Sequence, residues 1–178
     1  MQLQYGERFA LEVAGRGYIR YENRRYGINL GWSEDPVLEW EFRRTGAAGD
    51  VDPRLAVALY NRTAADCVVY AERDYGISLR WARDARRADP QEWVVEGDYP
   101  ILRLKNLVAA RRHDAYLLYG ERDYGINLVW GRRPAAGNFF LEPLAEPVLP
   151  GAGDYVPGEA SMRTRRPQTW AVEWDGRE

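Results

Sequence analysis

Two copies of an Arg-Asp-Tyr triplet lie 49 residues apart (73 to 122), and each is followed three residues later by a small polar residue. The candidate ligand-binding residues in these copies are Arg73, Asp74, Tyr75 and Ser78, and Arg122, Asp123, Tyr124 and Asn127. A carboxylate accepts hydrogen bonds from hydroxyl groups, and an amide or a hydroxyl both donates and accepts them. A tyrosine ring can cover an apolar C–H face. We therefore predict that these residues bind a saccharide.

A third copy, Arg24-Arg25-Tyr26, has an arginine in place of the aspartate. A guanidinium group donates hydrogen bonds but accepts none, so we expect this copy to be the poorest saccharide site. A structural role is the alternative for all three copies, in which an Arg–Asp pair locks the turn and the tyrosine covers the end of the fold. Repetition alone favours that alternative, because repeated hairpins need repeated turns.

The rest of the sequence offers little for catalysis. His113 is the only histidine and Cys67 the only cysteine, and we find no phosphate-binding glycine loop, Cys/His cluster or usefully spaced carboxylate pair. We therefore predict a protein that is not an enzyme, with no catalytic residue, metal site or cofactor. Cys67 lies where the other copies have Tyr18 and Tyr116, which indicates a structural thiol rather than a nucleophile.

Charge and composition limit the partners. The net charge of −2 over 178 residues gives no case for nucleic-acid binding, and no apolar run reaches the roughly 18 residues of a membrane span. The first residues lack the basic and apolar regions of a signal peptide, so we expect a cytoplasmic location unless another export route is used. Lys105 is the one lysine among 25 basic residues, which we interpret as the bias of a GC-rich bacterial genome.

Each triplet lies inside a 15-residue window that occurs three times without gaps: Tyr18–Trp32, Cys67–Trp81 and Tyr116–Trp130. Such a repeat predicts one supersecondary unit used three times. The first part of each window is apolar and β-rich, and the last part places Ile, Leu and Trp on one face with a period of two. A glycine follows each tyrosine and suits a turn with positive φ. Each window therefore predicts a β-hairpin with one buried face.

Two further strands should flank each hairpin. The predicted opening strands are Arg8–Val13, Arg54–Leu59 and Ile101–Leu107. The predicted closing strands are Pro36–Phe42, Pro90–Gly97 and Pro167–Gly176, the last chosen because Pro-Gln-x-Trp-x-Val-Glu also occurs in the second repeat. This choice implies an insertion at 133–166 in the third repeat, rich in Pro and Gly, whose first half packs on the body. The alternative for the third closing strand is Asn138–Leu141.

Four strands used three times are typical of a β-trefoil, in which six strands form a barrel and three hairpins cap one end. The period is 46 to 49 residues, measured from Arg8 to Arg54 and from Tyr18 to Cys67. A propeller has blades of similar length, but three blades are too few to close around an axis. We predict an all-β, pseudo-threefold β-trefoil forming a single domain over 1–178, with repeats at about 5–50, 51–98 and 99–178.

The chain also resembles the ricin-type β-trefoil lectin family, which has a Gln-x-Trp motif in each repeat. Gln91-Glu-Trp93 and Gln168-Thr-Trp170 match this motif, and Leu38-Glu-Trp40 matches it without the glutamine. The resemblance implies the same fold and carbohydrate binding. It departs from the family at the sugar-binding aspartate, whose position is filled by three residues that cannot accept a hydrogen bond: Arg20, Val69 and Leu118.

These observations predict a non-enzymatic, lectin-like carbohydrate-binding module with two or three weak sites related by the repeat. Weak sites can add up when they engage one branched or surface-displayed glycan. The alternative is a protein–protein interaction module that uses the hairpin end of the fold or the 133–166 insertion. The expected partner is accordingly a glycan or another protein.

Overall fold

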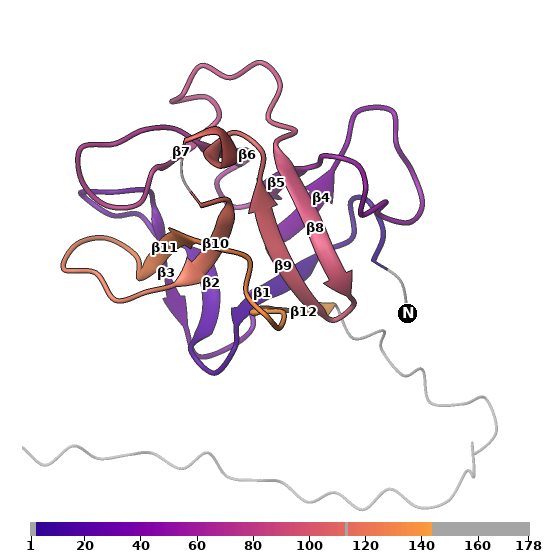
Figure 1. The fold of residues 1–178 in the computed structure, drawn as a ribbon, viewed down its shortest axis with the longest axis horizontal. Helices are drawn as coiled ribbons and strands as arrows, with labels where there is room; N and C mark the ends of the chain where they lie inside the picture. The colour runs from indigo at the N-terminus through magenta and orange to yellow at the C-terminus, as the bar shows by residue number, and fades with distance from the viewer. Residues whose placement is uncertain (1–2, 113, 144–178) are drawn as a thin grey trace, which may run out of the picture. The chain divides into compact units, whose positions relative to one another are not determined.

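A computed structural model describes residues 3–112 and 114–143, and this part of the chain is all-β with antiparallel strand pairing (Figure 1). It also contains a short 3₁₀ turn, η1 (Ala109–Arg111), and no helix in it is long and apolar enough to cross a membrane. Its strands are β1 (Phe9–Val13), β2 (Gly17–Tyr21), β3 (Leu30–Ser33), β4 (Trp40–Arg43), β5 (Ala58–Asn61), β6 (Asp66–Tyr70), β7 (Leu79–Trp81), β8 (Trp93–Asp98), β9 (Ile101–Asn106), β10 (Tyr116–Tyr119), β11 (Leu128–Gly131) and β12 (Phe139–Pro143).

The three predicted hairpins are confirmed as β2–β3, β6–β7 and β10–β11, hereafter hairpins one, two and three. They share one register, with Ile19 opposite Trp32, Val68 opposite Trp81, and Leu117 opposite Trp130. The glycine after each tyrosine has a positive φ of 77° to 92°, a conformation that suits glycine because it has no Cβ. Equal spacing in the sequence therefore gives equivalent hairpins.

The opening and closing strands pair into a ring. β12 pairs with β1, β1 with β4, β4 with β5, β8 with β9, and β9 with β12. β5 and β8 are joined just before β5, where the Val57 N–H donates to the Trp93 carbonyl at 2.7 Å and the Trp93 N–H donates back at 3.0 Å. Each of these six strands therefore has a partner on both sides, which removes exposed edges.

The closing strand of the third repeat differs from the prediction. β12 pairs with β1 over its whole length, from Phe9 opposite Pro143 to Val13 opposite Phe139. The place beside the first strand that was predicted for Pro167–Gly176 is therefore occupied by β12, which confirms the alternative at Asn138–Leu141. Residues 167–176 and the part of the predicted insertion after 143 lie outside the described residues.

An equivalent hydrogen bond in each repeat explains how β12 can close the ring without a tryptophan. The indole Nε1 of Trp40 donates to the Ile19 carbonyl at 2.6 Å, and that of Trp93 donates to the Val68 carbonyl at 2.7 Å. The matching carbonyl of the third hairpin, Leu117, accepts instead from the side-chain amide of Asn138 at 3.0 Å. Phe139, the next residue, is fully buried and fills the core. Two adjacent side chains thus do what one tryptophan does in the other repeats.

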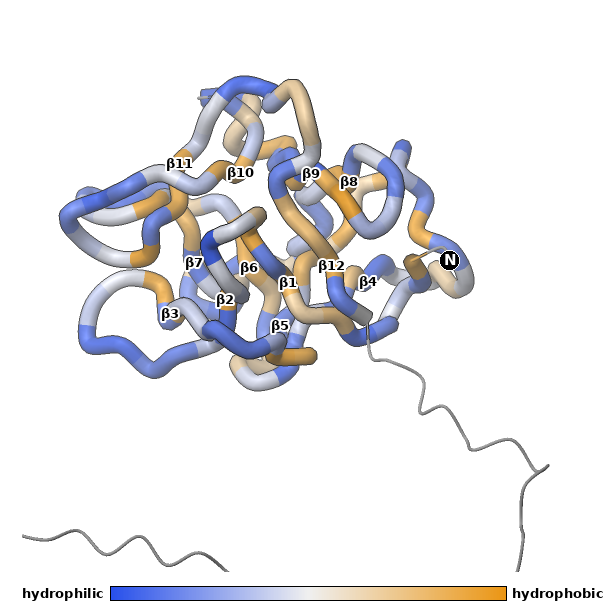
Figure 2. The backbone as a smooth tube through the Cα atoms, turned by 90° about the horizontal axis from the view of Figure 1, so that it is seen from below, coloured by the Kyte–Doolittle hydropathy of each residue, from blue (hydrophilic) through white to orange (hydrophobic). Residues whose placement is uncertain are grey.

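The core lies where the period-two pattern places it. The Ile and Leu side chains of the third strand of each repeat are all buried, as is Trp81, while Trp32 and Trp130 are half-buried and pack against the core. In Figure 2 the loops at the left of the view are blue and hydrophilic, whereas much of the strand backbone in the middle is orange and hydrophobic. The strands supply the stabilising burial and leave the hairpin loops for solvent.

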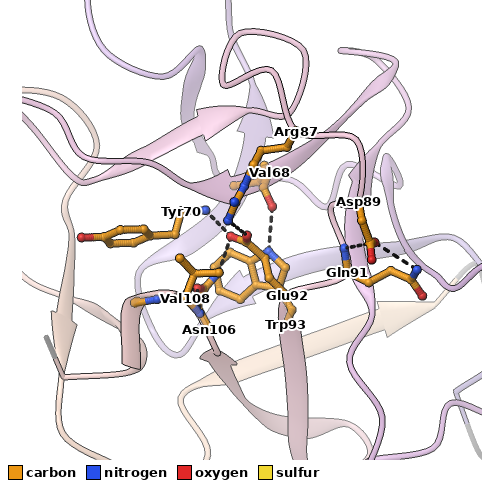
Figure 3. A network of polar contacts seen from close by, with 10 residues as sticks. Val68, Tyr70, Arg87, Asp89, Gln91, Glu92, Trp93, Asn106 and Val108 are labelled. Atoms are coloured by element: carbon orange, nitrogen blue, oxygen red, sulfur yellow. Dashed lines mark hydrogen bonds and ion pairs between the residues drawn. The ribbon is translucent and has the colours of Figure 1, made fainter. Parts of the chain in front are cut away.

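Two buried carboxylates tie the hairpins to the ring. Glu92, only 4% exposed, accepts hydrogen bonds from the Tyr70 backbone N–H, from Asn106 Nδ2 at 2.8 Å and from Arg87 Nη2 at 3.0 Å (Figure 3). Glu39, at the same place before a tryptophan, accepts from the Tyr21 backbone N–H and the Thr63 hydroxyl. A buried carboxylate is costly unless such donors surround it. These hydrogen bonds therefore hold the end of the first strand in hairpins one and two.

We expect Phe139→Ala to lower the free energy of unfolding by about 3–5 kcal/mol, because it empties a fully buried site in β12. Chemical denaturation would measure the change. Phe140→Ala is the matched control, since its half-buried ring points to the other side of the strand, and we expect a loss of about 1 kcal/mol. Equal losses in the two variants would contradict the role given to β12.

Candidate functional site

The loops of the three hairpins project to the same side, at the left of Figure 1, and together line one hollow of about 540 Å³. We call it the shared hollow. Its lining comes from Arg24, Arg25, Tyr26 and Gly27 of hairpin one, Arg73, Tyr75 and Gly76 of hairpin two, and Asp123, Tyr124 and Gly125 of hairpin three. Residues predicted to form separate sites in separate repeats therefore lie around one space.

A second depression, of about 340 Å³, lies between hairpins two and three, and we call it the hairpin groove. Its lining is Asp74, Tyr75, Gly76, Glu121, Arg122, Asp123, Tyr124 and Val129. Tyr75, Gly76, Asp123 and Tyr124 line both spaces, so the groove and the shared hollow are adjacent. Six of the eight predicted ligand-binding residues line one or the other.

The remaining two predicted residues, Ser78 and Asn127, line neither space. The Asn127 side-chain oxygen accepts from the Arg122 backbone N–H at 3.3 Å, and Asn29 does the same for Arg24 in hairpin one. Ser78 is half-buried, and its carbonyl accepts from the Ala71 N–H at 3.3 Å. The Asn127 side chain therefore closes its own hairpin, which is a structural role, and Ser78 is half-buried at the equivalent position of hairpin two.

The first arginines of the three triplets, Arg24, Arg73 and Arg122, make two kinds of contact. Arg24 donates to the Leu30 carbonyl at 3.1 Å and Arg73 to the Leu79 carbonyl at 3.4 Å, each within its own hairpin. Arg122 instead reaches across to hairpin two and donates to the Gly76 carbonyl at 2.8 Å. Burial lowers the pKa of Arg73, and the charge of Arg80 lowers it further. Arg122 therefore fixes the width of the hairpin groove, while the other two shape their own turns.

Asp74 and Asp123 are exposed, and neither makes a hydrogen bond or ion pair with another described residue. An Arg–Asp turn lock would have required Arg73 to meet Asp74, but its guanidinium meets the Leu79 carbonyl. Both oxygens of each carboxylate thus keep their capacity to accept hydrogen bonds from a ligand. The geometry favours binding over turn locking for the two aspartates.

The tyrosines that end the three triplets are strongly exposed. Tyr26, Tyr75 and Tyr124 have 74%, 81% and 76% of their surface accessible, so none acts as a lid over the core. All three line the shared hollow. Contiguous exposed rings of this kind mark surfaces that bind other molecules.

Aromatic contacts between repeats hold the hairpins in place. A tyrosine at the end of the first hairpin strand meets a tryptophan of the following repeat, and the third repeat meets the first in the same way. The ring centroids are 5.7 to 6.1 Å apart in the pairs Tyr21–Trp81, Tyr70–Trp130 and Tyr119–Trp32. Tilted pairs at this distance are favourable beyond their buried area. The cycle of contacts brings the three loops together.

The sequence pattern missed two features of this site. Arg24, Arg25 and Tyr26 were expected to form a separate, poorest site, yet they line the same hollow as the other copies. Their position one 49-residue step before the second triplet places them at an equivalent loop tip, but it does not show that the tips converge. Glu121 adds a third carboxylate to the hairpin groove, and it repeats as the aspartates do, because Glu72 fills its place in the second copy and only the first copy departs, with Asn23.

Other chemistry is limited in the described part of the chain. No group of three or more His, Cys, Asp or Glu side chains in it could hold a metal ion. Burial raises the pKa of the Cys67 thiol to about 11, and the charge of Asp66 adds to the rise. The thiol is therefore protonated at neutral pH, in keeping with a structural role. No protein-family model, curated protein or solved structure matches the chain.

We expect Cys67 to react slowly with iodoacetamide near neutral pH, because the reactive thiolate is only about one part in a thousand at pH 8 when the pKa is about 11. The alkylation rate of the folded protein should rise about tenfold for each pH unit between 8 and 10. Mass spectrometry of quenched samples would measure it, with free cysteine as the reference. A rate that levels off near pH 8.5 would show an ordinary, accessible thiol.

Proposed function

We propose that the chain is a non-enzymatic, lectin-like carbohydrate-binding module with a pseudo-threefold β-trefoil fold. The fold proposal is supported by the closed ring of six paired strands and by the three hairpins in one register. The cyclic tyrosine–tryptophan contacts support the threefold relation. The resemblance to ricin-type lectins points to the same fold.

One observation carries the functional proposal. Asp74 and Asp123, with no partner among the described residues, flank the exposed rings of Tyr75 and Tyr124 in a single groove. A saccharide needs acceptors for its hydroxyl groups and a flat apolar surface for its C–H face, and this groove provides both. Arg122, held on the Gly76 carbonyl, adds a donor beside them.

The proposed site differs from the one that the family resemblance implies. The family places its aspartate in the second strand of a repeat, where Val69 is fully buried in this chain. The carboxylates here lie instead at the tips of the hairpins. One ligand in the hairpin groove would contact two repeats at once, so the two predicted weak sites become halves of one site.

A protein–protein interaction module is the second candidate. Exposed tyrosines and arginines at one surface favour it, because these residue types dominate the energetics of protein interfaces. The hairpin end of the fold is the surface concerned. The two free carboxylates favour the saccharide, since a ligand rich in hydroxyl groups uses acceptors that lack a protein partner.

We expect the double variant Asp74→Asn/Asp123→Asn to bind its best glycan more weakly by about 1–3 kcal/mol for each carboxylate that contacts a hydroxyl. The glycan would be chosen from an array with the unaltered protein, and affinity measured by calorimetric titration. The asparagines keep the size of the side chains and remove their charge, so the fold should be retained.

Asp35→Asn, in the exposed loop after β3, is the matched control and should leave affinity unchanged. Unaltered affinity in the double variant, with a normal melting curve, would remove the aspartates from the site. Binding to no glycan, together with capture of one defined protein partner that depends on Tyr75 and Tyr124, would establish the interaction module instead.

A further inference from the structure

The two adjacent spaces at the hairpin tips carry opposite charge. Arginines dominate the shared hollow, where Arg24, Arg25 and Arg73 face the single carboxylate of Asp123. Carboxylates dominate the hairpin groove, where Asp74, Glu121 and Asp123 face the single cation of Arg122. The surface is therefore basic at one end and acidic at the other, with Tyr75 and Tyr124 between them.

One residue creates much of this difference. Arg25 stands at the position that holds Asp74 and Asp123 in the other hairpins, one and two 49-residue steps away. With an aspartate there, all three tips would carry the same Arg-Asp-Tyr triplet. Arg25 instead brings a cation to the rim of the hollow, where its guanidinium lies 5.3 Å from the centroid of the Tyr26 ring.

The three arginines of the hollow keep donors for a ligand. Arg24 and Arg73 each use one nitrogen on a carbonyl of their own hairpin, and a guanidinium group has five N–H donors. Among the described residues, none of the three forms an ion pair with a carboxylate. Uncompensated guanidinium groups that converge on one space favour a carboxylate or sulfate over a neutral group.

We propose that the preferred ligand is an acidic saccharide, with one sugar carboxylate or sulfate in the shared hollow and the hydroxyl groups of the neighbouring sugar in the hairpin groove. This inference rests on the proposed carbohydrate function and names its ligand class. The exposed tyrosine rings lie where the two sugars meet. The acid group contacts Arg24, Arg25 and Arg73, and the hydroxyl groups contact Asp74 and Asp123.

Tyrosines and arginines can also bind a nucleic acid. The charges of the hairpin groove argue against that ligand. A single strand carries a phosphate at every nucleotide, so a strand crossing the hollow would also lie on the three carboxylates of the groove. Like charges at that distance are repulsive. The surface fits a ligand with one acid group followed by neutral hydroxyl groups.

Matched pairs of saccharides test the proposal on the full chain. A disaccharide with a single glucuronate unit is compared with its methyl ester, and 6-sulfated N-acetyllactosamine with the unsulfated form, by calorimetric titration at low and moderate salt. We expect the acidic member of at least one pair to bind about tenfold more tightly, with the difference shrinking as salt rises. The pair that shows the difference identifies carboxylate or sulfate as the acid group.

The decisive variant is Arg25→Asp, which gives hairpin one the residue of the other two hairpins. We expect it to lose the preference for the acidic saccharide while binding the neutral member at least as well. Arg132→Asp is the control with the same change in charge, since the Arg132 side chain is 93% exposed and lines neither space. It should keep the preference within about twofold.

Three results would overturn the proposal. Equal binding of acidic and neutral members, or an equal effect of both variants, would leave carbohydrate binding in place and remove the acidic preference. Tighter binding of a single-stranded dT oligomer than of any saccharide would assign the hollow to nucleic acid. Absence of binding to every saccharide on the array and in the pairs would refute the proposed function itself.

Discussion

The arrangement of the hairpin end depends on the contacts that pass from each repeat to the next. A tyrosine ring of one hairpin packs on a tryptophan of the following repeat, and the third repeat packs on the first, so the contacts form a closed cycle. Each contact fixes the angle between two hairpins, and a closed cycle fixes all three angles together. The loops can therefore converge on one hollow without a core of their own. The buried carboxylates of Glu39 and Glu92 extend this constraint to the ring of strands, because they accept from the backbone N–H groups of Tyr21 and Tyr70, two of the tyrosines in this cycle.

In each hairpin loop, some side chains bond to the hairpin itself and others are exposed at its tip. Asparagine and arginine side chains that turn back onto their own hairpin satisfy the backbone and stiffen the loop, as Asn127 and Arg73 do. The residues between them are then free to point outwards at no structural cost. A stiff loop loses little entropy when it binds, which matters for a site built on loops. The bonded side chains therefore allow the same loop to present an exposed tyrosine and an unpaired aspartate at its tip.

Much of the fold was predictable because the repeat makes equivalent positions visible in the sequence. The hairpins, their glycines and the buried Ile and Leu positions all follow from period-two patterning in three aligned copies. The third closing strand was not predictable in the same way, because Asn138 and Phe139 share the hydrogen bond and the burial that one tryptophan provides elsewhere. A search for tryptophan therefore selected Trp170.

For the site, the sequence indicated the residue types but not their convergence, since spacing along the chain carries no information on how far loop tips lean towards each other. The sequence also gave Ser78 and Asn127 the same weight as the aspartates. In the structure the Asn127 side chain bonds to its own hairpin, and Ser78 is half-buried.

The convergence of three loops on one space has a consequence for valency. A fold with three equivalent repeats invites the expectation of three independent sites, and proteins with several sites can cross-link cells or polymers. Under the proposed function, one ligand would fill the adjacent hollow and groove together, because four residues line both spaces. One copy of this chain would then be monovalent for that ligand, and it would mark or tether a target without gathering several targets into an aggregate.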